Sequence, residues 1–372
     1  MKKTISVFVC IAILFLLIPL TFFGISASSA ITIEATTGIS LYEKNADERR
    51  PMASTTKIMT ALVAIENADI NSIFTVSKKS INVDGSQLGL LEGDKISLSD
   101  LLYMLMLKSA NDAAETIAEN IAGSIEAFAD MMNQKADEIG LSNTHFANPH
   151  GLPNDNHYTT ARELALIAAE ALKNETFAKI VHTQKAKLNY HGLVIENSNR
   201  LLTAYEYTTG IKTGFTKAAG RCLVTSAQKD GVTLINVTLN DGNDWNDHKE
   251  MFNSGFARVG RYTLYDTGEY VAKAPVLNGQ HEAEFINEEP IYGVSIDNQK
   301  IDYMFTNCIS PTLYAPVFAD KTYAHTEMVY KNRNIQKISL KLKSDIPQRE
   351  DEWTFSQRFI YYIEQLFKNI LP

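Results

Sequence analysis

Residues 50–61 read RPMASTTKIMTA, and this stretch decides the fold. The apolar spacing from Ile58 onward predicts a helix that starts near Ser54. Ser54 and Lys57 are three residues apart and share one helix face, while a helix N-terminus favours developing negative charge. A neutral lysine can take the proton of a serine and so turn its hydroxyl into a nucleophile. Taken alone, the pattern is more typical of a serine N-cap followed by a surface lysine.

A second motif lies further along the chain, at Ser109-Ala110-Asn111. It follows an apolar helical run at residues 101–107 and precedes another predicted helix. A serine and an asparagine two residues apart at such a break can project into one cleft. The hydroxyl could relay a proton and the amide could hold a carbonyl, although helix capping explains either residue alone.

The third motif is Lys212-Thr213-Gly214. Lysine and threonine can bind a carboxylate, and a glycine lets a substrate backbone approach a strand. The three motifs in this order match the Ser-x-x-Lys, Ser-Asp-Asn and Lys-Thr-Gly set of penicillin-binding proteins and class A β-lactamases, with Ala110 in place of the central aspartate.

The chain thereby resembles the low-molecular-mass penicillin-binding D-alanyl-D-alanine carboxypeptidases. Residues 50–61, NPHGL at 148–152, HYTTA at 157–161 and GIKTGFTKAAG at 210–220 carry the resemblance. It implies an α+β fold with a penicillin-binding/β-lactamase-like transpeptidase domain, in which helices pack on an antiparallel sheet. A small C-terminal all-β domain and an amphipathic tail helix follow in this family.

The resemblance also implies a reaction and its residues. The substrate is a peptidoglycan stem peptide ending in D-Ala-D-Ala, and β-lactam antibiotics are inhibitors. The catalytic residues would be Ser54 as nucleophile, Lys57 as general base and Ser109 as proton relay. Asn111 would hold the acyl side chain, Lys212 and Thr213 the terminal carboxylate, and Gly214 and Phe215 would line the substrate strand, with backbone amides of Ser54 and Phe215 as oxyanion hole. No cofactor or metal is implied.

One segment departs from the family pattern. Several relatives carry an arginine where residues 240–245 read NDGNDW. Carboxylate binding could rest on Lys212 and Thr213 alone, or draw on Arg200 or Arg221.

Three other functions compete with this interpretation. A serine β-lactamase needs a carboxylate that activates water, and Glu163 is the candidate, but Thr160 to Glu163 also fits a helix capping box. A catalytically silent penicillin-binding wall protein is disfavoured by the three intact motifs. Metal hydrolysis is disfavoured because the histidines at 145, 150 and 157 lack helical His-Glu-x-x-His spacing.

The N-terminus has the plan of a secretory signal peptide at residues 1–30. Two lysines precede an apolar run at residues 5–25, and small residues follow at 26–30. An uncleaved membrane anchor is the alternative. Either way we expect an exported protein at the outer face of the cytoplasmic membrane or in the cell wall. The net charge of −8 argues against nucleic-acid binding.

The rest of the chain divides into three parts. Residues 31–260 predict the catalytic domain, with strands on both flanks of a helical middle, and residues 270–348 a small β-rich domain. Residues 351–372 predict an amphipathic helix that associates with a membrane surface, or one that packs on its own domain. Cys222 and Cys308 are expected to be two buried thiols rather than a disulfide.

Overall fold

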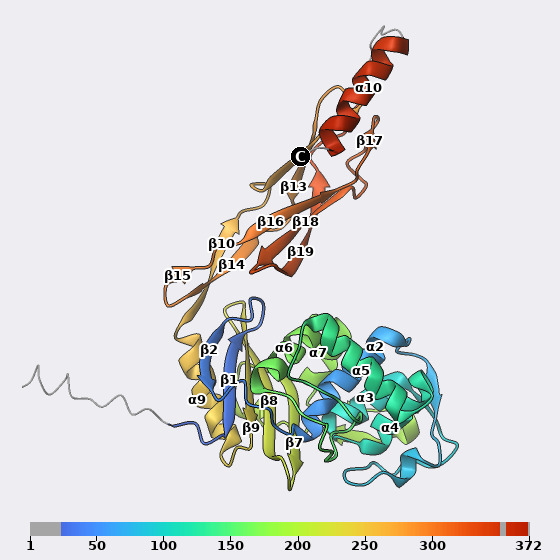
Figure 1. The fold of residues 1–372 in the computed structure, drawn as a ribbon, viewed down its shortest axis with the longest axis vertical. Helices are drawn as coiled ribbons and strands as arrows, with labels where there is room; N and C mark the ends of the chain where they lie inside the picture. Colours follow the sequence, from blue (N-terminus) through green and yellow to red (C-terminus); the bar gives the residue numbers. More distant parts are fainter. Residues whose placement is uncertain (1–23, 350–354, 371–372) are drawn as a thin grey trace, which may run out of the picture.

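The computed structural model describes residues 24–349 and 355–370 (Figure 1). A five-stranded antiparallel sheet lies at its centre, in the order β2-β1-β9-β8-β7. The N-terminal strands thus pair with late ones, as the sequence predicts. The strands are β1 (Ser29–Glu34), β2 (Ser40–Lys44), β7 (Thr208–Thr216), β8 (Gly220–Lys229) and β9 (Val232–Leu239).

Helices cover both faces of this sheet. Val224 and Val237 point into the main hydrophobic core on one face, whereas Thr225 and Thr238 contact His248 of α9 on the other. The first face carries most of the helices: α2 (Lys57–Asn67), α3 (Leu98–Leu107), α4 (Asn111–Ala122), α5 (Ile125–Ile139), α6 (Ala161–Leu172) and α7 (Glu175–His182). The second face carries α9 (Asp244–Phe256), while the short α8 (Leu201–Ala204) precedes β7.

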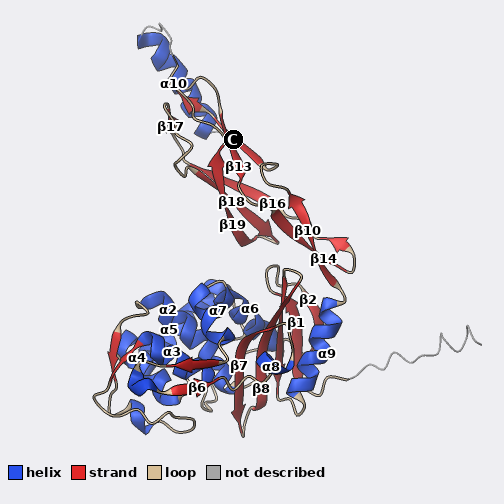
Figure 2. Ribbon diagram, turned by 180° about the vertical axis from the view of Figure 1, so that it is seen from behind, coloured by secondary structure: helices blue, strands red, loops and turns tan. Residues whose placement is uncertain are grey.

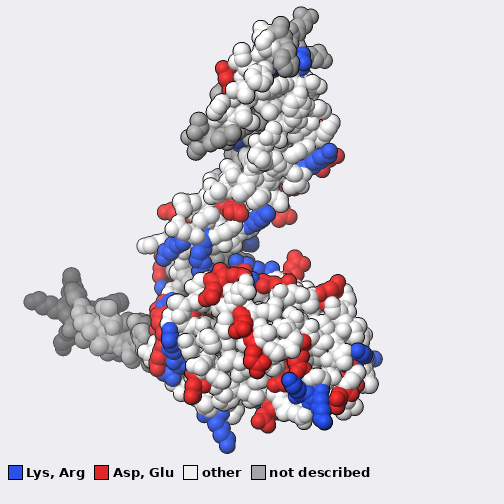
Figure 3. All heavy atoms as spheres, turned by 45° about the vertical axis from the view of Figure 1, so that its right-hand side comes forward, with Lys and Arg blue, Asp and Glu red and all other residues white. Residues whose placement is uncertain are grey.

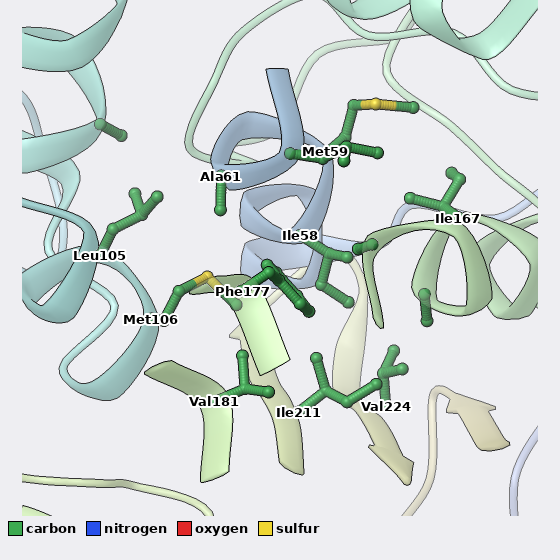
Figure 4. Packing of buried hydrophobic residues seen from close by; sticks show 14 of the residues in the cluster. Ile58, Met59, Ala61, Leu105, Met106, Ile167, Phe177, Val181, Ile211 and Val224 are labelled. Atoms are coloured by element: carbon green, nitrogen blue, oxygen red, sulfur yellow. The ribbon is translucent and has the colours of Figure 1, made fainter. Parts of the chain in front are cut away.

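Helix α2 runs through the interior of this domain. All eight residues from Lys57 to Ala64 are buried, so every side of the first two turns of the helix is covered. Figure 4 shows Ile58 close to Phe177 and Ile211, between α2 and the sheet. Because α2 is enclosed by apolar side chains, the residues at its start are held on a rigid element. Two small hairpins complete this part: β3 (Ile73–Thr75) with β4 (Lys95–Ser97), and β5 (Lys185–Lys187) with β6 (Val194–Glu196).

Beyond α9 the chain forms a second group of strands (Figure 2). They surround a second core that includes Phe285, Met328 and Leu340. One sheet contains β10 (Val259–Tyr265), β14 (Ile291–Ile296) and β15 (Gln299–Lys300). The other has the order β11-β13-β19-β18-β16, with β11 (Val271–Ala274), β13 (Ala283–Asn287), β16 (Met304–Ile309), β18 (Ala324–Tyr330) and β19 (Arg333–Leu342). A short parallel pair joins β12 (Val276–Leu277) to β17 (Leu313–Tyr314).

Helix α10 (Phe355–Ile370) ends the described chain. Five large apolar side chains on it are exposed: Phe359, Ile360, Ile363, Leu366 and Phe367. Its amphipathic character agrees with the sequence pattern. Among the described residues, no helix has the length and apolarity to cross a membrane.

The fold begins before the expected boundary at residue 30. Ile25 and Ala27 are buried against Met251 of α9, and β1 already starts at Ser29. The small residues at 26–30, which resemble the end of a signal peptide, are also small enough to pack beneath α9. The expected signal segment up to residue 23 lies outside the described residues.

The sequence predicts two buried free thiols, and the burial is confirmed for only one of them. Cys222 is buried, and burial raises the pKa of its thiol to about 11. Cys308 is only half-buried, because it lies on the edge strand β16. Both thiols are free.

Glu163 anchors a loop as well as a helix end. Thr160 Oγ1 accepts from the backbone N–H of Glu163 at 3.1 Å, which is the capping bond that the sequence predicts. The carboxylate of Glu163 accepts from the backbone amides of Ser142 and Asn143 and from the hydroxyl of Thr144. It therefore fixes the turn that follows α5.

We expect Glu163→Ala to lower the free energy of unfolding by about 2 kcal/mol or more, because it leaves these partly buried donors without an acceptor. Glu126→Ala is the matched control, since Glu126 is an exposed first-turn acid of α5. Its loss should cost less than about 1 kcal/mol. Urea unfolding of both variants measures the difference, and equal costs would contradict the anchoring role.

Candidate active site

Ser54 lies in a 3-10 turn, Ala53–Thr56, directly before α2. Ala53 has a positive φ of 48°, and its carbonyl accepts from Thr56 Oγ1 at 2.8 Å. His157 Nδ1 accepts from the Ala147 amide, so its Nε2 carries the hydrogen and donates to Thr56 Oγ1 at 2.7 Å. Burial lowers the pKa of His157 to about 3, which keeps the ring neutral. This chain of contacts fixes the backbone on which Ser54 sits.

Gly151 explains why the NPHGL segment contains a glycine. Its φ is +88°, and a Cβ there would lie 2.0 Å from the Ala53 carbonyl oxygen. Only a glycine allows this loop to lie so close to the Ala53–Thr56 turn.

Lys57 is fully buried beneath Ser54. Its Nζ lies 3.2 Å from Ser54 Oγ, and it donates to Asn111 Oδ1 and to the His150 carbonyl, both at 2.7 Å. In the neutral amine these two acceptors take both N–H groups. The remaining lone pair is then available for the proton of Ser54.

The pKa of Lys57 is well below its ordinary value. Burial is the main cause, the positive charge of Lys212 adds to it, and Asp112 opposes both. A lysine that is neutral at moderate pH can act as a general base. The chemistry of Lys57 therefore depends on the low polarity around it and on its neighbouring lysine.

Lys212 is the second buried lysine of the site. Burial lowers its pKa to about 7, and its Nζ donates to the Thr213 carbonyl at 3.0 Å. It lies in β7 directly after Ile211, which belongs to the main hydrophobic core. Near neutral pH it can both carry a positive charge and give up a proton.

The Ser-Ala-Asn motif lies at the break between α3 and α4. Ser109 has a φ of +62° and is half-buried. Asn111 is buried, donates from Nδ2 to the Asp84 carbonyl at 2.6 Å and accepts from Lys57. The carboxylate of Asp112 accepts from three successive amides at residues 88–90. This segment is thereby held beside Lys57.

Strand β7 carries the third motif along an edge of the sheet. A Cβ on Gly214 would lie 3.0 Å from the Ser54 amide nitrogen. The strand therefore contacts the Ala53–Thr56 turn near its start. Thr213 is half-buried, and the Phe215 side chain is 65% exposed. An edge strand has backbone groups available for pairing with an extended peptide.

Arg200 and Arg221, either of which could assist carboxylate binding according to the sequence, differ in their surroundings. Arg221 donates to the carboxylate of Asp244 from Nε at 3.0 Å and from its terminal nitrogen. Asp244 belongs to the NDGNDW segment that departs from the family pattern. Arg221 is therefore held by an acid, whereas Arg200 is exposed at the start of α8.

Several residues of the site were not assigned a role from the sequence. Glu115 lies 3.3 Å from His150 Nε2, and the carbonyl of His150 contacts Lys57. Thr56, His157 and Asp112 support the turn and the neighbouring loop. The motif segments contain or adjoin most of these residues, but backbone contacts have no signature in side-chain spacing.

Comparisons with known proteins agree with this geometry. A family described as "D-alanyl-D-alanine carboxypeptidase" matches residues 20–243. The "D-alanyl-D-alanine carboxypeptidase DacF" of Bacillus subtilis is 36% identical over 277 residues, which cover 71% of each chain.

Solved structures extend the likeness to the whole fold. The D-alanyl-D-alanine carboxypeptidase DacD of Francisella tularensis is 26% identical with a TM-score of 0.62, over 88% of this chain and 95% of that one. A peptidoglycan synthesis regulatory factor of Streptococcus pneumoniae, 24% identical over 87% of this chain and 100% of that one, has the same fold with a TM-score of 0.71. The chain therefore belongs to the D-alanyl-D-alanine carboxypeptidase family and is a serine-type enzyme of that family.

Proposed function

We propose that Ser54 is the nucleophile and Lys57 the general base with which this enzyme removes the terminal D-alanine from peptidoglycan pentapeptides. The contacts of Lys57 are the observation that carries the proposal. Two of its possible N–H bonds go to Asn111 and His150, and Ser54 is its third neighbour. A buried amine arranged in this way takes a proton from Ser54 and from nothing else in contact with it.

Acylation then proceeds in two steps. The Ser54 proton moves to Lys57 Nζ while Oγ bonds to the carbonyl carbon of the penultimate D-alanine. The backbone amides of Ser54 and Phe215 stabilise the oxyanion, which contributes a few kcal/mol in enzymes of this kind. The C–N bond then breaks as the proton held by Lys57 passes by way of Ser109 and Lys212 to the nitrogen of the leaving D-alanine. This transfer leaves Lys57 neutral again.

Binding and deacylation use the same cleft. The substrate lies along β7, where Gly214 leaves room for its backbone, while Lys212 and Thr213 take the terminal carboxylate and Asn111 the acyl side chain. Arg221 could assist only by giving up its bonds to the Asp244 carboxylate, whereas no carboxylate of the described residues is paired with the exposed Arg200. In deacylation Lys57 takes a proton from water as the water oxygen bonds to the acyl carbon. The ester C–O bond breaks, and the proton returns to Ser54 Oγ. A β-lactam acylates Ser54 in the same way.

A β-lactamase is the alternative, and the surroundings of Glu163 argue against it. A lactamase needs a carboxylate free to activate water. The Glu163 carboxylate instead accepts bonds from residues 142–144. Slow release of a penicillin adduct is therefore expected.

The segments beyond the active site support the proposal that the enzyme works at a membrane surface. We assign residues 31–260 to catalysis, with residues 24–30 packed onto them, and 270–348 to a β domain. Tyr362 of α10 lies 3.4 Å from Tyr314 of β17, oxygen to oxygen, so one side of α10 contacts the β domain. The exposed side chains of Ile360, Ile363, Leu366 and Phe367 on α10 would contact a membrane surface. This fits an exported enzyme at the outer face of the cytoplasmic membrane or in the cell wall.

Nucleic acid is not a partner in this proposal. On the face drawn in Figure 3, acidic and basic side chains of the described residues are interspersed. Together with the net charge of −8, this pattern does not favour a phosphate backbone.

Ser54→Ala should lower D-alanine release from a D-Ala-D-Ala pentapeptide by about 10⁴-fold or more, because the nucleophile is lost. Mass spectrometry should find one penicillin per wild-type chain, retained for longer than a catalytic turnover, and none on the variant. Ser72→Ala, away from the motifs, is the matched control. Wild-type release by Ser54→Ala would overturn the proposal, and rapid turnover of penicillin would favour the lactamase.

The pH dependence of kcat/KM should be bell-shaped, with its alkaline limb centred near pH 7. Activity rises with pH as Lys57 loses its proton, and the lowered pKa of Lys57 brings this limb into the accessible range. It falls again as Lys212 deprotonates with a pKa of about 7. In Lys212→Arg the side chain stays protonated, so the alkaline limb should move to higher pH. An unchanged alkaline limb would remove Lys212 from this role.

Ile363→Glu combined with Phe367→Glu should abolish sedimentation of the full chain with phospholipid vesicles. The two substitutions place charges in the exposed apolar face of α10. Glu364→Ala is the control on the same helix, and release of D-alanine from a soluble peptide should stay unchanged in both proteins. Undiminished vesicle binding by the double variant would contradict the membrane role of α10.

A further inference from the structure

Three side chains with metal-binding atoms meet on the β domain, far along the chain from the active-site motifs. They are Cys308 on β16 and His325 and Glu327 on β18. Their ligand atoms all lie within 4.8 Å of one another. His325 Nε2 and Glu327 Oε1 are 3.8 Å apart.

Strand register brings the three together. β16 and β18 are antiparallel, with Cys308 directly opposite His325 and Thr306 opposite Glu327. His325 and Glu327 are two residues apart, so they point to the same face of the sheet. The intervening Thr326 and the following Met328 are buried in the opposite face. The cluster is thus on the outward face, where all three residues are half-buried and reachable from solvent.

The donor set has a chemical preference. A thiolate, an imidazole and a carboxylate are the ligands that Zn²⁺ takes in proteins, at about 2.0–2.3 Å. Tetrahedral ligand atoms at these bond lengths are roughly 3.5 Å apart. Side-chain movements of about 1 Å would therefore bring the three ligand atoms to the distances that a bound Zn²⁺ requires. Three protein ligands leave the fourth position to water.

The neighbouring strand β19 carries a positive charge that would compete with a metal ion for the Glu327 carboxylate. On β19, Lys337 lies opposite Glu327 and Ser339 opposite His325. The ammonium of Lys337 can neutralise the Glu327 carboxylate in the absence of metal, and a bound cation would displace it. The edge position of β16 leaves the other side of the cluster open.

We propose that Cys308, His325 and Glu327 form a Zn²⁺ site that ties the edge strand β16 to β18. Binding forms bonds from the metal to Sγ, an imidazole nitrogen and a carboxylate oxygen, and the thiol proton is released to solvent. The site takes no part in the chemistry at Ser54. Since the register exists only in the folded sheet, binding stabilises that sheet.

Metal titration of the full, reduced, chelator-treated chain tests the proposal. One Zn²⁺ per chain should bind, and Co²⁺ should bind with the charge-transfer absorption of a thiolate ligand. Cys308→Ser and His325→Gln should each weaken Zn²⁺ binding by at least about tenfold, the effect seen even for residues that only support a ligand. Thr306→Ala, on the same face of β16, is the matched control and should bind as the wild type does.

Two results would overturn the proposal. The first is equal Zn²⁺ affinity of the wild type and Cys308→Ser, and the second is bound Co²⁺ without thiolate absorption in the wild type. Circular dichroism and one-to-one acylation by penicillin confirm that each variant is folded. The Co²⁺ spectrum of the wild type stands independently of any variant.

Discussion

The active site depends on the burial of one amine. Lys57 lies beneath the nucleophile with no solvent around it, and its contacts are a hydroxyl, an amide oxygen and a backbone carbonyl. Each of these comes from a different segment, so the position of the amine requires α2, the start of α4 and the loop at residues 148–152 together. The apolar enclosure of α2 serves the same end, because it allows a lysine at the helix start to lose its water. The packing of the core around α2 therefore also determines how basic the Lys57 amine is.

Much of this could be predicted from the sequence. The three motifs identified Ser54, Lys57, Asn111 and Lys212, and the strand patterns on both flanks of a helical middle predicted how the sheet closes. These features depend on side-chain identity and on periodicity, which a sequence records directly. The roles of these four residues in the reaction, like those of Ser109 and Thr213, remain predictions.

Other features could not be predicted because they depend on backbone contacts or on strand register. The His150 carbonyl supports Lys57, but a carbonyl is common to every residue. Gly151 is required by an approach to Ala53 that only the folded loop reveals. Cys308 and His325 are 17 positions apart in the sequence, which is no recognised ligand spacing, yet they are direct neighbours across two strands. The start of the fold before residue 30 was hidden because small residues suit both a cleavage site and close packing.

The two buried lysines have a consequence for the stability of the protein. Both have a folded-state pKa below that of an unfolded chain, so unfolding takes up protons and stability rises with pH. Below the folded-state values the empty cleft must hold two like charges out of water, which opposes folding. An anion that pairs with Lys212 relieves part of this cost, because it binds the native state alone. In the proposed binding mode, the carboxylate of the substrate therefore also stabilises the folded protein, in addition to being held for cleavage.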